Sequence, residues 1–246
     1  MGRAAAECFA QDGARVAVLA RTQATIDETC AQLLASGSPE VLGLRADMTD
    51  AAQVDAAFSE VAGRWGALNI LVNAAGPSGA ARFDDLDDQA WMKALDEGCL
   101  GMVRCVRAAL PLLRQAEWAR VVNVSAHSVK RQGVGLVAYT AAKAAMTSVS
   151  KNLSLMLAPE EILVNTVSPG SFASPALKGW VESVGGDPND LYAIMRLIDE
   201  HYGHPAQMPR AGDPSEIGPV IAFLASRRNS YMTGADVNVD GGSDFC

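Results

Sequence analysis

The sequence predicts an α/β protein with a Rossmann-like, doubly wound parallel sheet in a single domain. Short runs rich in Val, Leu and Ile alternate with segments of helical spacing along almost the whole chain. Near-continuous apolar runs suit strands buried on both faces, and strand–helix alternation is typical of parallel sheets. The runs expected to form strands are residues 14–20, 41–46, 68–73, 120–124, 162–167 and 236–239.

Helices are expected between these strands. The chain begins with Met1-Gly2-Arg3 and three alanines, and Glu7, Gln11 and Asp12 exclude the apolar stretch of a signal peptide, so this segment is interpreted as a helix. Asp50 is a predicted N-cap before an apolar stripe of Val54, Phe58, Val61 and Trp65.

A second predicted cap is Asp213, which is followed by a first-turn proline and by Glu216 at the third helical position. The buried stripe of this helix is expected to be Ile217, Val220, Ile221 and Leu224.

One domain is expected over residues 1–246, because no linker or low-complexity stretch divides the chain. Residues 174–212 interrupt the alternation with Gly185-Gly186-Asp187-Pro188 and several prolines. This composition predicts a helical insert or lid over a site. Apolar residues such as Leu177, Trp180 and Met195 would then line a substrate pocket together with polar groups.

Composition excludes several classes of function. The 246 residues are 49% hydrophobic and 20% charged, with a net charge of −8, so the average surface repels nucleic acid and anionic lipid. Apolar stretches such as residues 220–225 are far shorter than the ~20 residues of a membrane-spanning helix. We therefore expect no nucleic-acid or membrane partner, and the five cysteines, odd in number and without a disulfide pattern, favour a cytoplasmic protein.

The cysteines and histidines give no strong metal or disulfide pattern. The five cysteines include no Cys-x-x-Cys pair, which argues against a disulfide framework and a zinc ribbon. His201 and His204 are three residues apart, a spacing that can place two imidazoles on one helical face. No further ligands are specified, so no metal is expected.

Tyr139 and Lys143 form a Tyr-x-x-x-Lys motif, and on a helix this spacing puts the phenol and the ammonium on one face. At ~5 Å and an effective dielectric of ~20, the lysine charge stabilises a phenolate by about 3 kcal/mol. That lowers the phenol pKa by roughly 2 from its reference value of about 10. The pair is therefore a candidate acid and base near neutral pH.

Several segments in order along the chain resemble the short-chain dehydrogenase/reductase family, and the resemblance covers essentially the whole sequence. These segments are Asp47-Met48-Thr49-Asp50, Asn73-Ala74-Ala75-Gly76, Tyr139 with Lys143, Val164-Asn165-Thr166-Val167-Ser168-Pro169-Gly170, and Thr233-Gly234 with Val239-Asp240-Gly241-Gly242. The resemblance implies that Tyr139 donates or accepts the proton, while Lys143 binds the nicotinamide ribose and lowers the tyrosine pKa.

The same resemblance implies a set of cofactor-binding residues in addition to Tyr139 and Lys143. They are Gly2, Arg21, Asp47, Met48, Asn73, Ala74, Ala75, Gly76, Pro169, Gly170, Phe172 and Ser174. An acid near Ala20 would indicate NAD(H), but Arg21 follows instead, and arginine suits a 2′-phosphate. The sequence favours NADP(H), with NAD(H) as the alternative if Arg21 is simply a solvated first-turn arginine.

The start of the chain departs from the family. Residues 1–6 resemble the end of the family's glycine-rich loop, and its first strand has no counterpart here. Gly2 at a helix N-terminus could still face a pyrophosphate. We expect the native protein to begin upstream of Met1.

The family's substrate-binding serine, thirteen residues before the tyrosine, corresponds to Ala126. Candidate replacements are Ser125, Ser128 and His127, although Ser125 should point to the opposite face of the strand and the other two require a rearranged loop. The alternative for His127 is a surface loop residue. Loss of such a donor typically lowers turnover by ~10²–10³.

The family's proton-relay asparagine corresponds to Gly98, which offers only backbone groups. Gly98 and Gly101 could alternatively be packing glycines that let another element approach. Two of four expected catalytic side chains are therefore replaced.

The sequence therefore predicts an oxidoreductase that transfers a hydride between NADP(H) and a carbonyl or secondary alcohol. One alternative is a dinucleotide-binding pseudoenzyme or regulatory subunit, motivated by Ala126 and Gly98. Another is a lyase or isomerase that uses Tyr139 and Lys143 as acid and base. The resemblance also implies a homo-oligomer, either a dimer or a tetramer, and the sequence does not specify the substrate.

Overall fold

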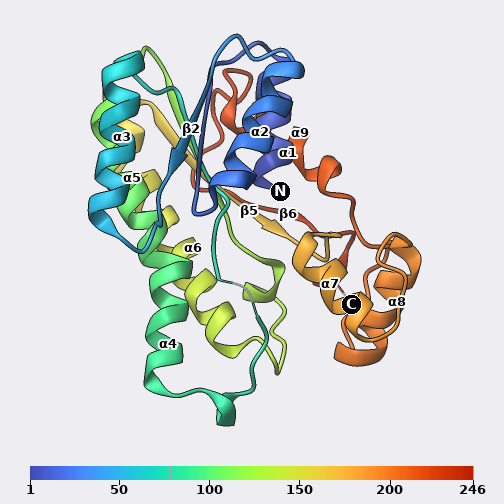
Figure 1. The fold of residues 1–246 in the computed structure, drawn as a ribbon. Helices are drawn as coiled ribbons and strands as arrows, with labels where there is room; N and C mark the ends of the chain where they lie inside the picture. The colour runs from blue at the N-terminus through green and yellow to red at the C-terminus, as the bar shows by residue number, and fades with distance from the viewer. Residues whose placement is uncertain (78, 246) are drawn as a thin grey trace.

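Parallel strands form the centre of the structure, in two separate sheets (Figure 1). The computed structural model describes residues 1–77 and 79–245. Within them, one sheet has the order β1–β2 and the other the order β3–β4–β5–β6. The strands are β1 (Val16–Ala20), β2 (Val41–Arg45), β3 (Ile70–Asn73), β4 (Ala119–Val124), β5 (Ile162–Pro169) and β6 (Asp236–Val239). The predicted α/β class and all the predicted strand positions are confirmed, with ends that shift by one or two residues.

Helices cover both faces of the strands (Figure 1). One layer contains α1 (Gly2–Gln11), α2 (Gln23–Ala35) and α9 (Pro214–Ala225). The opposite layer contains α3 (Ala51–Trp65), α5 (Gly101–Gln115) and α6 (Val137–Leu157). The helix α4 (Asp88–Leu95) continues into α5 through a π-helical turn, Asp96–Leu100. No helix in the described residues has the length and apolar character needed to cross a membrane.

The predicted helix starts are present. The Asp50 carboxylate accepts hydrogen bonds from the backbone N–H groups of Ala52 and Gln53, and this caps α3. Asp213 and Glu216 form a capping box at the start of α9, which satisfies backbone donors that would otherwise lack partners. Local sequence therefore decides where these helices begin.

Residues 174–212 contain two helices, α7 (Pro175–Ser183) and α8 (Leu191–Tyr202), which lie beside the end of β5 (Figure 1). They pack against each other around an apolar cluster of their own, which includes Val181, Ile194 and Met195. Leu177 and Trp180, expected to line a pocket, pack against this cluster, and Met195 is only 5% exposed. The expectation that Met195 faces a pocket is wrong, because its side chain forms the contact between the two helices.

The larger sheet is bonded to α6 through buried polar side chains. The side-chain amide of Asn73 on β3 donates to the Asn123 side-chain oxygen on β4 (2.8 Å), and the Asn123 amide donates to the Ser150 hydroxyl on α6 (2.8 Å). Asn123 is fully buried. Buried polar groups are costly unless they are paired, so this chain of bonds fixes the position of α6 over the sheet.

Replacing Asn123 with leucine is expected to lower the free energy of unfolding by about 2 kcal/mol or more, because the buried Asn73 amide loses its acceptor. Urea unfolding measures this change. The control is Asn152→Ala on the same helix. Its exposed amide donates to the Ser148 carbonyl oxygen, and its loss should change stability by less than about 0.5 kcal/mol. Equal effects of the two substitutions would contradict the structural role of Asn123.

Candidate active site

Tyr139 and Lys143 lie one turn apart near the start of α6, as their spacing predicts. The Lys143 side chain is buried, and its Nζ atom donates a hydrogen bond to the Val124 carbonyl oxygen at the end of β4 (2.8 Å). Since an ammonium carries three protons, this bond leaves donors for a bound molecule. The phenol and the ammonium are therefore held at the carboxyl end of the sheet, where parallel α/β proteins bind ligands.

Burial sets the protonation of this pair. Burial lowers the pKa of Lys143 to about 8, because the charged ammonium has lost its hydration. Burial also raises the pKa of Tyr139, because it disfavours the phenolate. The expected lowering of the tyrosine pKa by Lys143 is therefore not seen. Tyr139 remains a protonated phenol at neutral pH, which suits a proton donor.

The turn after β3 passes directly over the Lys143 ammonium. A Cβ atom at Gly76 would lie 2.8 Å from Lys143 Nζ, so only glycine fits at this position beside the ammonium. Asn73 is the last residue of β3, and its side-chain amide donates to Asn123 on the neighbouring strand. Ala74 and Ala75 connect it to Gly76. This segment brings backbone groups, rather than side chains, to the site.

The two candidate serines both bond to α6. The Ser125 hydroxyl is within hydrogen-bond distance of the Thr147 hydroxyl (2.8 Å) and donates to the Lys143 carbonyl oxygen (3.3 Å). The Ser128 hydroxyl accepts a hydrogen bond from Thr140 (3.1 Å) and is 1% exposed. Ala126 lies between them and is buried. In this arrangement both hydroxyls are engaged in holding the loop against the helix.

His127 points toward the end of β5. Its Nδ1 atom lies 3.2 Å from the Pro169 carbonyl oxygen, and its ring makes an edge contact with the ring of His204 (6.3 Å between centroids). Burial lowers the pKa of His127, so the ring is neutral near pH 7. A neutral ring that donates from Nδ1 to the carbonyl has an acceptor at Nε2.

The two histidines of the spaced pair do not share a helical face. Since α8 ends at Tyr202, His204 lies beyond the helix and contacts His127, whereas His201 contacts Trp180 and bonds the Leu197 carbonyl. Among the described residues, no group of three or more metal-ligating side chains is present.

Gly98 lies in the π-helical turn between α4 and α5 and is closely packed. A Cβ atom at this position would lie 2.6 Å from the Ala142 Cβ atom and 3.2 Å from Pro77 Cγ. Ala142 neighbours Lys143 on α6, so this turn packs against α6 beside Lys143. The packing interpretation of Gly98 is the one the structure fits, since an asparagine side chain would require its neighbours to move.

A basic and polar group of residues lies at the ends of β1 and β2. The exposed Arg21 guanidinium is 3.9 Å from the Asp47 carboxylate, and Arg45 donates to the Arg21 carbonyl oxygen (3.3 Å). Hydrogen bonds from the Thr49 amide and hydroxyl lower the pKa of Asp47. The Met48 side chain packs closely against Gly101.

Arg45 was not singled out from the sequence, although it is a basic residue near the end of the predicted strand 41–46. The parallel register aligns it with Ala20, the residue before Arg21. A basic residue at the end of the neighbouring strand therefore falls beside Arg21, the residue predicted to suit a 2′-phosphate.

The N-terminus of α1 lies at the same edge of the strands. Gly2 opens this helix, its N-cap Met1 provides no side-chain hydrogen bond, and a Cβ atom at Gly2 would lie 3.0 Å from the Ala74 Cβ atom. The free N–H groups of a first helical turn attract anions. An anionic group would find unpaired donors at this end of α1.

The segment after β5 connects the site to α7. Gly170 lies against Asp240, where a Cβ atom would be 2.7 Å from the Asp240 Cα atom. Phe172 is buried and forms a bridge with Gly212, and the Ser174 hydroxyl accepts the Leu177 amide to cap α7. Ser174 thus has a structural role as the cap of the first helix of residues 174–212.

Arg131 is a second residue that the sequence did not single out. Its guanidinium donates to the carbonyl oxygens of Gly203 (3.2 Å), Pro205 (3.0 Å) and Ser243 (2.8 Å). These bonds tie the loop after α8 to the C-terminal turn. Only the three-dimensional contacts reveal this role, because the partners are separated by more than 70 residues.

The chain is similar to proteins of one large enzyme group. A family profile described as "Enoyl-(Acyl carrier protein) reductase" matches residues 1–244. The short-chain reductase protein NovJ of Streptomyces niveus is 30% identical over 242 residues, which cover 98% of this chain and 89% of that protein. The NADPH-dependent reductase BacG of Bacillus subtilis is 28% identical, over 99% of this chain and 93% of that protein.

A solved structure shows the same arrangement of elements. The NADPH-bound short chain oxidoreductase from Pseudomonas aeruginosa PAO1, described as containing an atypical catalytic center, superimposes with a TM-score of 0.88 at 27% identity. The match covers 98% of this chain and 91% of that one.

The packing around Gly98 makes a substitution at this position informative. Gly98→Ala is expected to lower the free energy of unfolding by about 1–3 kcal/mol, because the added methyl group overlaps Ala142. Thermal or urea unfolding measures the change. The control is Gly63→Ala in α3, where an added Cβ meets nothing within 4 Å and should stabilise the helix by about 0.5–1 kcal/mol. Equal changes in the free energy of unfolding for Gly98→Ala and Gly63→Ala would contradict the close packing of Gly98.

Proposed function

Because the chain belongs to the short-chain dehydrogenase/reductase family, an NAD(P)-dependent oxidoreductase family, we propose that it transfers a hydride between NADP(H) and a carbonyl or secondary alcohol substrate. The observation that carries this proposal is the half-buried Tyr139 beside the buried Lys143 at the carboxyl end of the sheet. Tyr139 is the proton donor in the direction of carbonyl reduction.

The described residues fit a bound dinucleotide. The first turn of α1 offers backbone N–H groups to the pyrophosphate, and Gly76 leaves space beside the Lys143 ammonium for the ribose. Arg21 and Arg45 supply positive charge at the strand ends for a 2′-phosphate. This charge and the NADPH-dependent relatives support NADP(H) over NAD(H).

The bound dinucleotide supplies or accepts the hydride, and the residues of the chain handle the proton. The Tyr139 hydroxyl donates a hydrogen bond to the carbonyl oxygen of the substrate and transfers its proton as charge develops on that oxygen. The Lys143 ammonium, held by the Val124 carbonyl, offers hydrogen bonds to the ribose and stabilises the phenolate left by the transfer. Its positive charge is needed for both tasks.

Reaction without the family serine is slow in this proposal, because Ala126 provides no second donor to the substrate oxygen. The P. aeruginosa structure, described as NADPH-bound and as containing an atypical catalytic center, supports cofactor binding by a chain of this fold whose catalytic center departs from the usual one. A substrate enters from the side of α7 and α8, and the residues of these two helices determine which substrate binds. We also propose that the chain forms a dimer or tetramer.

A second candidate is a dinucleotide-binding regulatory subunit with no turnover. The closely packed Gly98 favours it, because the π-helical turn has no space for a relay side chain without movement. Replacing Ala126 with serine separates the candidates. An increase in turnover of about tenfold or more supports an impaired enzyme, and no turnover in either form supports the regulatory subunit.

The direct test of the proposed reaction is Tyr139→Phe. Removal of the hydroxyl is expected to lower kcat for NADPH-dependent reduction of a ketone panel by at least ~10²-fold, because no other group delivers the proton. NADPH binding should persist. The control is Tyr231→Phe, which removes a hydroxyl from a side chain that is 97% exposed. Unchanged turnover in Tyr139→Phe would refute the assigned role.

The pH dependence follows from the lysine. As pH rises through about 8, Lys143 loses its proton, so kcat for reduction is expected to fall with a pKa of about 8. The Tyr139 phenol keeps its proton over this range because its pKa lies above its usual value of about 10. Steady-state rates from pH 6 to 10 measure the profile. Arginine at position 143 stays charged, so a pH-dependent fall that survives in Lys143→Arg would exclude the lysine as its origin.

Cofactor choice is tested by Arg21→Ala. Loss of the guanidinium is expected to raise the Kd for NADPH by about tenfold, which corresponds to about 1.4 kcal/mol, and to change the Kd for NADH less than twofold. Calorimetric titration gives both constants. Arg228→Ala removes an exposed arginine from the turn after α9 and serves as the control. Equal losses for NADPH and NADH would show that Arg21 does not recognise the 2′-phosphate.

A further inference from the structure

Arg120 is a buried arginine whose charge has no carboxylate partner. It is the second residue of β4 and is only 7% exposed. Its Nε atom donates to the Asn229 carbonyl oxygen (2.9 Å), and its Nη1 atom donates to the carbonyl oxygens of Ala119 (2.8 Å) and Glu161 (3.4 Å). Within the described residues, no carboxylate lies at ion-pair distance from this guanidinium. Since a buried charge is costly unless it is paired, the guanidinium favours an anion.

The Nη2 atom of Arg120 is open to a groove. In the part of the chain that the structure describes, Nη2 makes no hydrogen bond, whereas every fully buried side-chain nitrogen and oxygen there has a partner. Nη2 is therefore accessible from the groove that Arg120 lines. Because carbonyl oxygens hold the other two nitrogens of the planar guanidinium, the free N–H groups point in a fixed direction.

This groove, which we call the basal groove, has a volume of about 800 Å³ and lies at the amino ends of β4 and β5. Its walls are the end of α5, the turn between α6 and β5, and residues 230–233 before β6. The volume is in the range of small-molecule sites. Arg120 and Val124 are at opposite ends of β4, and four residues along a strand span about 13 Å. Since the Val124 carbonyl bonds Lys143, the basal groove is separate from the candidate active site.

Other charged groups of the basal groove already have partners. The Arg114 guanidinium donates two hydrogen bonds to the Glu160 carboxylate (2.7 and 2.8 Å). The Glu117 carboxylate lies 3.7 Å from the Arg227 guanidinium. These pairs compensate their own charges, so Arg120 is the cation that remains available to a ligand in the groove.

Glu161 and Trp118 define the kind of anion that fits. Burial lowers the pKa of Arg120, and the Glu161 charge raises it without an ion pair between the two side chains. Because Glu161 also repels an anion at Nη2, a monoanion is favoured over a dianion such as phosphate. The centre of the half-buried Trp118 indole ring is 5.8 Å from the Arg120 Cζ atom, so an aromatic surface lies next to the guanidinium. A carboxylate attached to a ring can therefore bond Nη2 and contact the indole.

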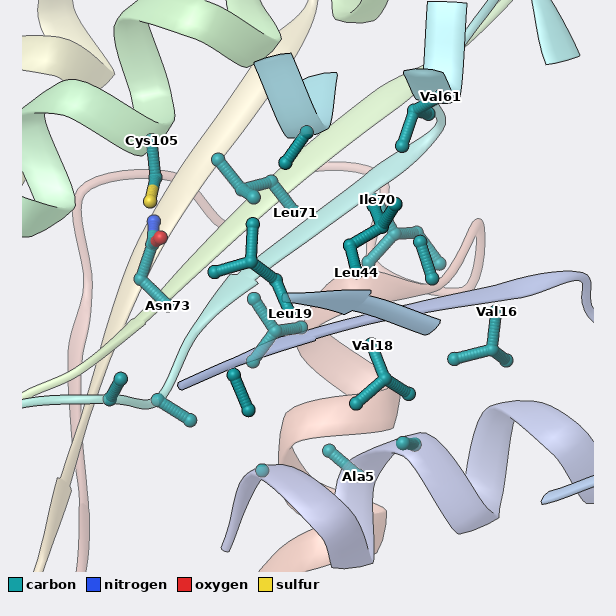
Figure 2. Close-up of a pocket in the computed structure, with 18 of the residues that line it drawn as sticks. Ala5, Val16, Val18, Leu19, Leu44, Val61, Ile70, Leu71, Asn73 and Cys105 are labelled. Carbon is teal, nitrogen blue, oxygen red and sulfur yellow. The ribbon is translucent and has the colours of Figure 1, made fainter. Parts of the chain in front are cut away.

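The cavity between β1 and β3 does not offer this chemistry. It has a volume of about 450 Å³, and most of the side chains labelled in Figure 2 are aliphatic, such as Val18, Leu19 and Leu71. The labelled Asn73 already donates its amide to Asn123. Apolar walls disfavour a carboxylate, because an unpaired charge is costly to bury. The charge chemistry therefore selects the basal groove.

We infer that the basal groove binds a small aromatic carboxylate, with a carboxylate oxygen on Arg120 Nη2 and the ring against the Trp118 indole. The bound carboxylate pairs a cation that the fold has removed from water but has given only neutral carbonyl partners. Neither Tyr139 nor Lys143 lines the basal groove, so the inference does not depend on the proposed reaction.

Titration with benzoate tests the inference, and the indole N–H resonance of Trp118 in a heteronuclear NMR spectrum reports binding. Benzoate is expected to shift this resonance to saturation. Benzamide, a neutral molecule of nearly the same shape, is expected to bind at least about tenfold more weakly, because a charged acceptor makes the stronger hydrogen bond to a guanidinium. Inorganic phosphate should also bind more weakly than benzoate. The absence of a saturable shift with benzoate, or equal binding of benzamide or phosphate, would overturn the inference.

Two variants locate the bound benzoate. Arg120→Gln is expected to raise the Kd for benzoate at least about tenfold, because a charge-assisted hydrogen bond is lost. Arg196→Gln makes the same charge change at an exposed position on α8 and should leave this Kd unchanged. Arg120 also holds three carbonyl groups, whereas Glu161→Gln leaves those bonds in place and is expected to lower the Kd about threefold by removing a repulsive charge. Its control is the exposed Glu60→Gln on α3. An unchanged or raised Kd in Glu161→Gln would contradict the site.

A second copy of the chain is the other possible source of a carboxylate. Shifts of the Trp118 resonance that grow with protein concentration in the absence of benzoate would assign the basal groove to a second copy and overturn the inference. A spectrum that does not change with protein concentration supports a small-molecule ligand. Neither readout uses cofactor or turnover, so failure here is distinct from failure of the proposed function.

Discussion

The candidate site depends on how α6 is held over the sheet. Strand β4 contributes Asn123, which is bonded on one side to Asn73 of β3 and on the other to Ser150 of α6. Near the other end of the helix, Lys143 bonds the last residue of the same strand. Because both bonds are buried, sliding or rotating α6 would leave polar groups unpaired. The bonds between α6 and the sheet, rather than the loop before the helix, therefore fix the position of the Tyr139 phenol.

The sequence was sufficient to predict the elements and their order. The strand from residue 162 is a continuous apolar run, and in the structure β5 is buried along its whole length. Asp50 and Asp213 cap helices as expected, because a cap is a local interaction between a side chain and nearby amides. Tyr139 and Lys143 were placed correctly relative to each other for the same reason, since helical spacing fixes their distance.

Features that depend on contacts between distant segments could not be predicted in this way. Spacing alone predicted that the Lys143 charge lowers the pKa of Tyr139. In the structure, burial raises the pKa of Tyr139 and lowers that of Lys143, and burial depends on the surrounding segments. The hydroxyl of Ser128 bonds Thr140, and His204 contacts His127, only because the loops fold back on α6 and β5. The single sheet expected from the pattern is divided in two. The order of the apolar runs along the sequence does not say which strands pair with each other.

The tight packing around Gly98 also constrains how such a chain can change over generations. Ala142 and Pro77 approach the glycine from two different elements. An asparagine placed at position 98 alone meets both neighbours at once, so it is expected to lower the free energy of unfolding even where its side chain could serve a proton relay. A relay side chain at this position would therefore need changes at its neighbours as well.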